Sequence, residues 1–457
     1  MDLHVDLERA AGATLRARLE NALRDGVRSG LLAPGTRLPA SRALSAQLGV
    51  SRGVVVDAYA QLSAEGYLHA RQGSGTTVAA TGAWRTPTTA AAPAGPPIRH
   101  DLSPFVPALD CFPRAAWRSA LNRALRSAPD ERLGLPPAAG VPELRAALAG
   151  YLSRSRGVRA VAGQVIVCNG LRQGLGLLWG ALAAGGAQRV AVEDPAWDGI
   201  AQTARDARLG VVEIPVDEDG LVVARLAAAR YRIDAVAVAP AHQYPTGAVM
   251  APARREALVA WAQEHGALVF EDDYDAEYRY DRAPIGSIQG LAPEHVAYGG
   301  SASKSLAPGM RLAWLVVPPR LLEPMTELQA RRGGMPAALD QLALADLVER
   351  GELDRHLRRQ RRRYRRQRDA LLAALAARIP DVAVRGAAAG LFVVLRLPPG
   401  VDAEAVVRHA RAVGLAIEPG GGSPPAVVVG YGNLAEAAIG AAVDALAASV
   451  RAARPSA

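Results

Sequence analysis

Residues 301–311 read SASKSLAPGMR and contain the only lysine of the 457-residue chain. The chain has 53 lysine and arginine residues, and all of them except Lys304 are arginine. Arginine replaces lysine on most surfaces because both are long cations, but a guanidinium group does not lose its proton in proteins. Lys304 is therefore a candidate for covalent chemistry that needs a neutral primary amine, and chance retention of one lysine is the alternative.

The side chains around Lys304 indicate an anion site. Ser301, Ser303 and Arg311 supply two hydroxyls and a guanidinium, a combination typical of phosphate binding. The stretch is not a Walker A loop, because Lys304 follows a serine and not the glycine that the loop requires. A penicillin-binding site is excluded as well, because its second lysine motif cannot occur in a chain with one lysine.

The composition excludes several classes of protein. Two cysteines supply neither a disulfide framework nor a zinc cluster, and they indicate a reducing compartment, so we expect a cytoplasmic protein. Early acidic residues argue against a signal peptide, and no uncharged stretch is long and apolar enough to span a membrane. The formal net charge of +9 and a hydrophobic content of 50% fit a nucleic-acid-binding globular chain of two or three domains.

A change in composition divides the chain. Residues 80–99 read ATGAWRTPTTAAAPAGPPIR, which is rich in alanine and proline and nearly free of large apolar side chains. Such a segment predicts a semi-extended linker. We therefore expect a small domain at 1–79 and a large domain at 100–457.

The pattern of residues 1–79 predicts three helices followed by a β-hairpin. Leucines at 15, 19 and 23 recur every four residues, as on the buried face of a helix. Ser51 is placed to cap a later helix, and Gly49 and Gly66 are placed to end helices. The expected elements are helices at 15–27, 40–48 and 52–64 and strands at 67–70 and 76–78. This order is that of a winged helix-turn-helix.

Residues 34–76 read PGTRLPASRALSAQLGVSRGVVVDAYAQLSAEGYLHARQGSGT and closely resemble the DNA-binding domain of the GntR regulators. The resemblance implies contacts with double-stranded promoter DNA from Arg42, Ser51, Arg52, Gly73 and Ser74. Arginine can bind base edges through two hydrogen bonds and can bind phosphate through its charge. Val56 stands where the family often has another basic residue. A winged helix that contacts another protein is the alternative.

In residues 100–457 short apolar segments alternate with helical patterns, which predicts a parallel or mixed sheet covered on both faces by helices. The segments are 164–168, 189–193, 211–215, 235–239, 267–271, 296–299 and 312–317, and a helix is expected from Gly174. Ligands of such sheets bind beyond the carboxyl ends of the strands. We therefore expect the functional site at those ends.

Four clusters at these strand ends carry the candidate chemistry. Residues 271–275 read EDDYD, and this run of carboxylates can either bind a metal ion or hold a cationic ring nitrogen. Residues 193–197 read EDPAW and offer an aromatic face, and residues 241–247 read AHQYPTG. The fourth cluster is the stretch around Lys304.

In this order the clusters resemble those of the fold type I aminotransferases that use pyridoxal 5'-phosphate. The family signatures are DLSPFVPALDCFP, AAGVPELRAALAGYLSRSRGV, AVEDPAW, PAHQYPTG, EDDYDAEYRYD and SASKSLAPGMRLAW, and the resemblance runs from about Asp101 to the C-terminus. With the GntR-like domain, the whole chain resembles the MocR family of transcription regulators. The implied fold is a winged helix-turn-helix joined to an α/β aminotransferase-like domain with a large and a small lobe, in a homodimer.

The resemblance assigns the cofactor contacts residue by residue and implies no metal ion. Lys304 would form the internal aldimine with the cofactor aldehyde, Asp272 would bond the protonated pyridine nitrogen and Tyr274 the phenolic oxygen. Trp197 stands where the family usually has tyrosine, and it would stack on the ring. The phosphate would be held by Ser301, Ser303 and Arg311 and by the backbone of Gly170, Leu171 and Arg172, which leads into a helix N-terminus.

Three positions depart from the aminotransferase pattern. Tyr244 replaces the asparagine before Pro-Thr-Gly, as MocR proteins generally have an aromatic residue there, and it is a further candidate cofactor contact. His242 and Gln243 are both candidates for the bonding role of that asparagine. Leu135 occupies the position of a tyrosine that usually reaches the neighbouring subunit's phosphate. Val428 occupies the position of the arginine that clamps a substrate carboxylate, which argues against efficient turnover of an α-amino acid, although other arginines could substitute.

Residues 355–368 read RHLRRQRRRYRRQR, with nine arginines and no acid. This run can be a second DNA-contacting surface, or it can pair with acidic surface in the dimer. The leading hypothesis is a transcription regulator whose cofactor-binding domain senses a small-molecule effector, either pyridoxal phosphate itself or an amine or amino-acid derivative. A working aminotransferase with an accessory DNA-binding domain is the alternative, and a relic domain that only dimerises is a third hypothesis.

Overall fold

The computed structural model describes residues 7, 10–71, 75–79, 96–275, 277–280, 285–386, 388–421 and 424–454. Contacts between residues divide the chain into two compact units, Met1–Ala94 and Gly95–Ala457. Each unit has its own hydrophobic core. Most of the expected linker at 80–99 lies outside the described residues.

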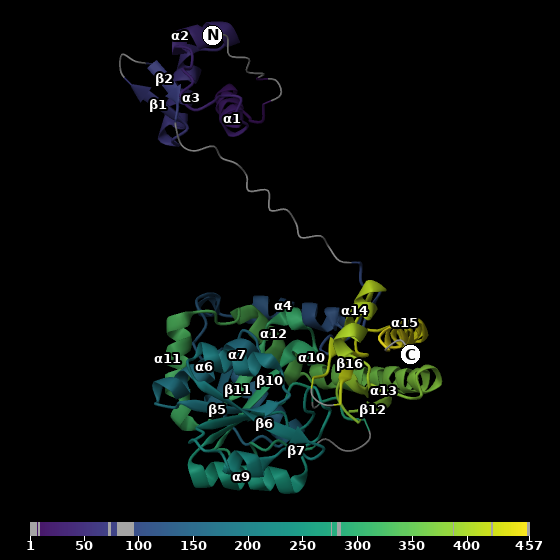
Figure 1. Cartoon of the computed structure of the whole chain (residues 1–457). Helices are drawn as coiled ribbons and strands as arrows, with labels where there is room; N and C mark the ends of the chain where they lie inside the picture. Colours follow the sequence, from purple (N-terminus) through teal and green to yellow (C-terminus); the bar gives the residue numbers. More distant parts are fainter. Residues whose placement is uncertain are drawn as a thin grey trace. The chain divides into compact units, whose positions relative to one another are not determined.

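The smaller unit consists of three helices and a two-stranded antiparallel hairpin (Figure 1). Its elements are α1 (Leu15–Arg28), α2 (Ser41–Leu48), α3 (Arg52–Ala64), β1 (Leu68–Arg71) and β2 (Gly75–Val78). Two of the three leucines that predicted the first helix, Leu19 and Leu23, are fully buried in the core of the unit, whereas Leu15 at the start of the helix is exposed. The winged helix-turn-helix expected from the sequence is confirmed.

The turn between α2 and α3 has the end signals that its sequence predicts. Gly49 follows α2 with φ 65°, a left-handed conformation that glycine adopts without strain. Ser51 caps α3, because its hydroxyl accepts a hydrogen bond from the backbone N–H of Val54 at 3.4 Å. These two residues set where α3 begins, and so which side chains stand at its exposed start.

The larger unit is built on an eight-stranded mixed sheet, as expected from the alternating pattern. In spatial order the strands are β4 (Val165–Cys168), β11 (Ala313–Val316), β10 (Val296–Ser301), β9 (Leu268–Asp272), β8 (Ala235–Val238), β5 (Arg189–Asp194), β6 (Gly210–Asp217) and β7 (Gly220–Leu221). Strands β10, β9, β8, β5 and β6 are parallel neighbours, whereas β11 runs antiparallel to both of its neighbours and β7 antiparallel to β6.

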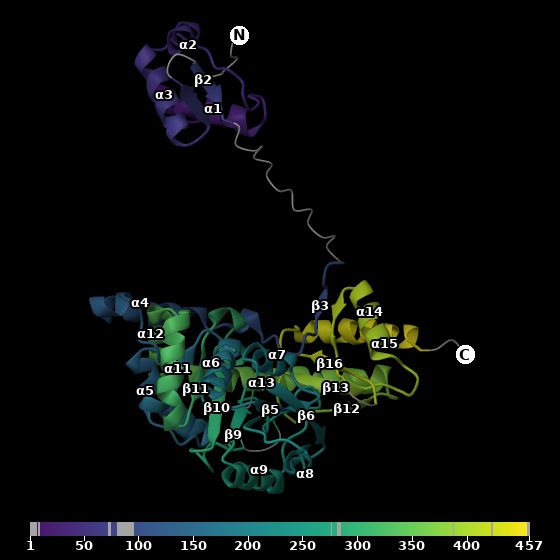
Figure 2. The same cartoon turned by 60° about the vertical axis from the view of Figure 1, so that its left-hand side comes forward.

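Both faces of this sheet are covered by helices (Figures 1 and 2). In β8, for example, Ala235 and Ala237 face one apolar core and Val236 and Val238 face another. One core is shared with α6 (Leu171–Ala184), α7 (Asp198–Asp206) and α11 (Pro319–Arg332), and the other with α8 (Val223–Ala227) and α9 (Pro252–His265). At the β4 end lie α4 (Arg114–Ser127), α5 (Pro142–Arg156) and α12 (Ala338–Glu349).

A small lobe follows the large sheet. Its sheet has the order β12 (Ala383–Arg385), β13 (Phe392–Arg396), β16 (Ala426–Gly430) and β15 (Glu418–Pro419), and its helices are α13 (Glu352–Arg378), α14 (Ala403–Ala412) and α15 (Ile439–Ala452). The short strand β3 (His100–Asp101) pairs with β14 (Leu415–Ala416), which ties the start of the unit to this lobe. Over the described ranges, no helix is both long and apolar enough to cross a bilayer.

Candidate cofactor site and DNA-contacting surface

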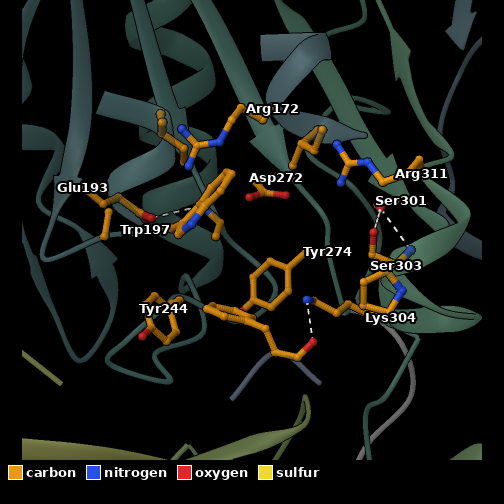
Figure 3. Close-up of a pocket in the computed structure, with 16 residues that line it drawn as sticks. Arg172, Glu193, Trp197, Tyr244, Asp272, Tyr274, Ser301, Ser303, Lys304 and Arg311 are labelled. Carbon is orange, nitrogen blue, oxygen red and sulfur yellow. Dashed lines mark hydrogen bonds between the residues drawn. The ribbon is translucent and has the colours of Figure 1, made fainter. Parts of the chain in front are cut away.

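A cavity of about 360 Å³ lies beyond the carboxyl ends of β5, β9 and β10, where the sequence predicted a site (Figure 3). Nearly all of the expected cofactor residues line it: Leu171, Arg172, Trp197, Tyr244, Asp272, Tyr274, Ser301, Ser303, Lys304 and Arg311. Phe105 and Glu193 also line it, and no role was expected for either.

Lys304 lies on α10 (Ala302–Ser305), the short helix that follows β10. Its Nζ donates a hydrogen bond to the backbone carbonyl of Phe105 at 2.7 Å and lies 4.7 Å from the centre of the Phe105 ring. Burial lowers the pKa of the Lys304 ammonium to about 8, although Asp275 and Asp272 oppose the shift. A much larger share of this amine is therefore neutral and reactive near neutral pH than for an ordinary lysine.

The run of carboxylates at 271–275 begins at the end of β9, and its side chains turn to different partners. In the parts of the chain that are described, no three histidine, cysteine or acidic side chains are placed to hold a metal ion. Three carboxylates of the run have protein partners: Glu271 accepts from Ser287 Oγ at 2.6 Å, Asp273 pairs with Arg156 Nε at 2.7 Å, and Asp275 Oδ2 lies 2.8 Å from His242 Nδ1. Asp272 remains.

Asp272 is a buried carboxyl group that forms no ion pair with any described residue. Its Oδ1 is buried without a hydrogen-bond partner. Burial raises the pKa of Asp272 to about 8, and the nearby carboxyls of Asp273, Asp275 and Glu193 add to the shift. A buried charge is costly unless it is paired. A protonated ring nitrogen placed in the cavity would supply the missing partner, as the sequence predicted for this residue.

Hydroxyls and a guanidinium converge at one end of the cavity (Figure 3). Ser301 Oγ donates to Ser303 Oγ at 2.9 Å and accepts from the backbone N–H of Ser303 at 3.1 Å. Arg311 Nη2 donates to the carbonyl of Asn169 at 2.9 Å, and a Cβ at Gly170 would collide with this guanidinium. Glycine at 170 therefore lets Arg311 lie against the backbone that leads into α6, which suits an anion.

Helix α6 begins at Leu171, three residues before the expected start at Gly174. Gly170, with φ 88°, is its N-cap residue, and the backbone N–H of Asn169 donates to the side-chain Oε1 of Gln173 at 2.5 Å. This local hydrogen bond stabilises the first turn, and the apolar pattern alone did not indicate it. The earlier start places the N–H groups of the first turn next to the cavity.

The aromatic side chains of the cavity are held by contacts that the sequence did not indicate. The guanidinium of Arg172 lies 5.3 Å from the centre of the Trp197 ring. Tyr274 donates its hydroxyl to the carbonyl of His242 at 2.8 Å, and Tyr244 donates to Glu418 Oε2 at 2.8 Å. The predicted contacts of Trp197, Tyr244 and Tyr274 with a cofactor stay predictions.

The two candidates for the role of the missing asparagine are engaged elsewhere. His242 is buried, with its ring stacked 4.5 Å from that of Phe392. Gln243 Nε2 donates to the carbonyl of Pro195 at 2.7 Å. Neither residue is among those that line the cavity.

Two known families match the two units. Residues 15–78 match the bacterial regulatory proteins of the gntR family, and residues 108–422 match aminotransferase class I and II. The HTH-type pyridoxine biosynthesis transcriptional regulator PdxR of Corynebacterium glutamicum is 33% identical over 440 residues, which cover 94% of this chain and 95% of PdxR. The probable rhizopine catabolism regulatory protein MocR of Rhizobium meliloti is 33% identical over 435 residues, which cover 90% of this chain and 88% of MocR.

This chain belongs to the MocR subfamily of the GntR transcription regulators. It is a helix-turn-helix regulator with an aminotransferase-like domain. The α-aminoadipate aminotransferase LysN from Thermus thermophilus, solved in complex with N-(5'-phosphopyridoxyl)-L-leucine, superposes with a TM-score of 0.69 and 28% identity. The superposition covers 77% of this chain and 92% of LysN.

The positions at which this MocR-type chain departs from the aminotransferase pattern differ in exposure. Leu135 is 90% exposed. Val428 is fully buried in the small-lobe sheet, in an apolar cluster that Tyr244 and Tyr274 pack against. Arg396, the arginine at the end of β13, is half-buried and does not line the cavity.

The DNA-contacting residues expected for a GntR domain lie partly in the described region. Arg42 and Arg52 are exposed near the starts of α2 and α3, and Ser51 caps α3. Gly73 and Ser74 lie outside the described residues. Two exposed arginines that the sequence did not single out lie at the hairpin: Arg71 ends β1, and Arg37 precedes it in the chain and lies against Gly75 of β2. A Cβ at Gly75 would lie 3.1 Å from Nε of Arg37, and Arg71 is the residue opposite Gly75.

The arginine run lies on α13, and six of its arginines are exposed: Arg355, Arg358, Arg359, Arg362, Arg365 and Arg366. Arg355 pairs with Glu352 at 2.8 Å and Arg366 with Glu436 at 3.6 Å. The other four form no ion pair within 4 Å with any described residue. A role of these arginines in DNA binding, or in pairing across a dimer, stays a prediction.

Proposed function

We propose that this protein binds pyridoxal 5'-phosphate at Lys304 and that the state of this site controls its binding to promoter DNA. The observation that carries the proposal is the unpaired, buried carboxylate of Asp272 in the same cavity as an amine of lowered pKa. The hydroxyls of Ser301 and Ser303 and the guanidinium of Arg311 fit the phosphate.

The cofactor would supply an aldehyde that condenses with a primary amine and an aromatic ring that accepts electrons. The side chains of the cavity would attach the cofactor and orient its ring. Lys304 would provide the amine, Asp272 would pair with the ring nitrogen, and Trp197 would cover one face of the ring. Because the relative PdxR is named for pyridoxine biosynthesis, the cofactor itself is one candidate signal, and an amine effector is the other.

The proposal includes a homodimer that presents two winged helices to a cytoplasmic promoter. Support comes from Leu133 and Leu135, which are 64% and 90% exposed in the segment where the family resemblance places contact with a second subunit. Large apolar side chains at such exposure are typical of interfaces. A ligand that favours one arrangement of the lobes would then shift the spacing of the two DNA-binding units.

A working aminotransferase is the second candidate, because the cavity brings together the lysine, aspartate and tyrosine that this chemistry uses. A relative, the 2-aminoadipate transaminase of Thermus thermophilus, is 32% identical over 325 residues. Incubation with a panel of amino acids and a keto acid tests it. Sustained multiple turnover would favour this candidate over the sensor.

The sensor function is tested with the full chain and its own operator. Duplexes that bind the protein are first enriched from a random DNA pool, and the affinity of one such duplex is then measured by fluorescence anisotropy. The comparison is between cofactor-free protein, cofactor-loaded protein and loaded protein with candidate amines. We expect DNA affinity to change by about tenfold with the state of the site, since allosteric coupling is typically about 1–3 kcal/mol. Equal affinity in all states would contradict the proposal.

The pH dependence of cofactor capture follows from the lowered pKa of Lys304. Only the neutral amine attacks an aldehyde, so the rate should rise about tenfold per pH unit below pH 8 and level off above it. Stopped-flow absorbance between pH 6 and pH 10 measures this rate, with N-acetyl-lysine methylamide as the free-amine reference. A rate that kept rising to pH 10, as for the reference, would contradict the lowered pKa.

Substitution of Arg52 by alanine should weaken specific DNA binding by about tenfold to a hundredfold, as expected for loss of a contact worth about 1–3 kcal/mol. Arg16→Ala is the matched control, because it removes the same charge from an exposed site on α1. Affinity is measured by anisotropy as a function of salt. If the DNA affinity of Arg52→Ala depends less on salt than that of the wild type, Arg52 contacts a phosphate. If the salt dependence is unchanged, Arg52 contacts a base edge. Wild-type affinity for Arg52→Ala would remove it from the interface.

A further inference from the structure

One end of the cavity lies beside the small lobe, away from the residues expected to hold the phosphate (Figure 3). The two faces of the small-lobe sheet differ. One face packs into the main core, and the other forms an apolar cluster with cavity residues Tyr244 and Tyr274: Phe392, Val394, Ala426 and Val428. The ring of Phe105 lies 4.5 Å from that of Tyr244 and 6.3 Å from that of Phe392. This end is therefore an aromatic and aliphatic wall.

One carboxylate contacts this wall through Tyr244, although it is not among the residues that line the cavity itself. Glu418 on β15 is directly opposite Val428 on β16, so the two side chains share one face of the sheet. Tyr244 donates its hydroxyl to Glu418 Oε2 at 2.8 Å, which fixes the position of the carboxylate. Glu418 also acts on Lys304, since it is one of the acids that oppose the lowering of the Lys304 pKa. The negative charge is thus within electrostatic reach of the reactive amine.

Apart from Lys304, which is the proposed point of cofactor attachment, the cations that line the cavity lie at its other end. Two arginines, Arg172 and Arg311, are among the described lining residues. Figure 3 shows both of them well separated from Tyr244, beyond Trp197 and Asp272. A carboxylate on a ligand that reached the small-lobe end would therefore meet aromatic rings and another carboxylate.

Arg396 is the cation of the small-lobe sheet that could attract a ligand carboxylate to this end of the cavity. It is opposite Ala426 on the cluster face of the sheet, next to Val394 along the same face. It is half-buried and does not line the cavity. Among the described residues no ion pair brings it to Glu418, although both belong to the same small sheet. Glu418 does not line the cavity either, but it accepts a hydrogen bond from the lining residue Tyr244 and acts on the pKa of Lys304, so its charge reaches this end of the cavity.

We propose that the effector is a primary amine that has no carboxylate and carries a second cationic nitrogen, as a short aliphatic diamine does. This inference rests on the proposed function, in which one amine group meets the cofactor at Lys304. The distal ammonium donates a charge-assisted hydrogen bond to Glu418 and lies against the rings of Phe105 and Tyr244. An amino acid instead brings its carboxylate against Glu418, so repulsion disfavours it.

Three primary amines with the same four-carbon chain test the inference: 1,4-diaminobutane, 1-aminobutane and 4-aminobutanoate, which end in a cation, a methyl group and an anion. Each is titrated into cofactor-loaded protein, and binding is read from the cofactor absorption band and from the melting temperature. We expect the diamine to bind about tenfold to a hundredfold more tightly than 4-aminobutanoate, as for a charge-assisted hydrogen bond, with 1-aminobutane between them. Equal affinities, or a preference for 4-aminobutanoate, would overturn the inference.

Variants separate the role of Glu418 from general effects of charge. Glu418→Gln keeps the shape of the side chain and removes its charge, so the affinities for 1,4-diaminobutane and 4-aminobutanoate should then differ by no more than about threefold. Tyr244→Phe should also reduce the preference for the diamine, because it removes the hydrogen bond that positions the carboxylate. Glu349→Gln, at an exposed site on α12, is the matched control and should keep the wild-type preference. If Arg396→Ala changed the affinity for 4-aminobutanoate and Glu418→Gln changed nothing, Arg396 would be the selecting residue and the inference would be wrong.

Cofactor capture is measured separately, by borohydride reduction and mass spectrometry. If the protein captures the cofactor but none of the three amines changes the cofactor absorption band, this inference is overturned and the proposed function stays intact. Absence of capture would overturn both.

Discussion

Replacement of Lys304 by alanine should abolish covalent capture of pyridoxal phosphate, because the chain has no other lysine side chain to take its place. In the wild type, borohydride treatment should fix one cofactor to the peptide that contains residues 301–311. In Lys304→Ala the mass of that peptide should stay unchanged. Weak reversible binding should remain, since Ser301, Ser303 and Arg311 still form the anion end of the cavity.

Lys304→Arg is the matched control for charge. Arginine keeps a long cation near the Phe105 carbonyl, but it cannot provide a neutral amine. Both variants should therefore lose capture, although only the alanine variant also loses the cation. Capture by Lys304→Arg would show that the cofactor attaches elsewhere.

The two variants also decide whether the site controls DNA binding. If capture or exchange at Lys304 is the signal, the affinity of either variant for the enriched duplex should no longer respond to cofactor or amine. A response equal to that of the wild type, in a variant that captures nothing, would contradict the proposed mechanism. The winged helix itself should keep its basal affinity, because Arg42, Ser51 and Arg52 belong to the other compact unit.

Much of this architecture could be predicted because its signals are local. The cap at Ser51 and the glycine at 49 determine where α3 begins, and both depend on residues within a few positions of the turn. The apolar segments of the large sheet are short, buried and bounded by polar residues, so their ends were expected within about two residues. The motif order then placed Asp272 and Lys304 at one edge of the sheet.

The contacts that complete the cavity could not be predicted, because they join residues far apart in the sequence. Lys304 bonds to Phe105 across 199 positions, and Tyr244 bonds to Glu418 across 174. No periodicity or local composition indicates such pairs. Phe105 did lie in a quoted family signature, so a signal for its importance was present, but its role depends on the packed fold.

The run at 271–275 shows how the fold resolves an ambiguity that sequence leaves open. Metal binding and pairing with a ring nitrogen were both compatible with a row of carboxylates. In the structure Glu271, Asp273 and Asp275 each meet a different partner, because successive side chains after β9 point in different directions. Only Asp272 of these acids lines the cavity, and this exposes it to a ligand.

Asp272→Asn should have opposite effects on the cofactor-free and the cofactor-loaded protein. Burial raises the pKa of Asp272 from a usual value near 3.8 to about 8. Between about pH 4 and pH 8 the folded state therefore keeps a proton on Asp272 that the unfolded state has released. Stability of the cofactor-free wild type should therefore fall as pH rises from about 4 to about 8. Asparagine removes this cost, so the variant should be more stable at pH 8, by on the order of 2 kcal/mol.

Cofactor affinity should change in the other direction. With the cofactor bound, the Asp272 carboxylate would have a cationic ring nitrogen as its partner, and truncation of such a buried pair costs about 3 kcal/mol, or roughly two orders of magnitude in Kd. Urea unfolding across pH 5–8 and a fluorescence titration with the cofactor measure the two effects. If Asp272→Asn bound the cofactor as tightly as the wild type, or lost stability with rising pH as the wild type does, Asp272 would not be the residue that pairs with the ring nitrogen.

Asp273→Asn provides the contrast that makes this prediction specific. Asp273 already has a buried cation, because Arg156 donates to both of its oxygens at 2.7 and 2.9 Å. Its loss leaves Arg156 uncompensated, so the cofactor-free protein should be destabilised by about 3–5 kcal/mol. Two adjacent and isosteric substitutions should thus move stability in opposite directions, because Asp273 has its partner in the protein and Asp272 would find its partner only in the ligand.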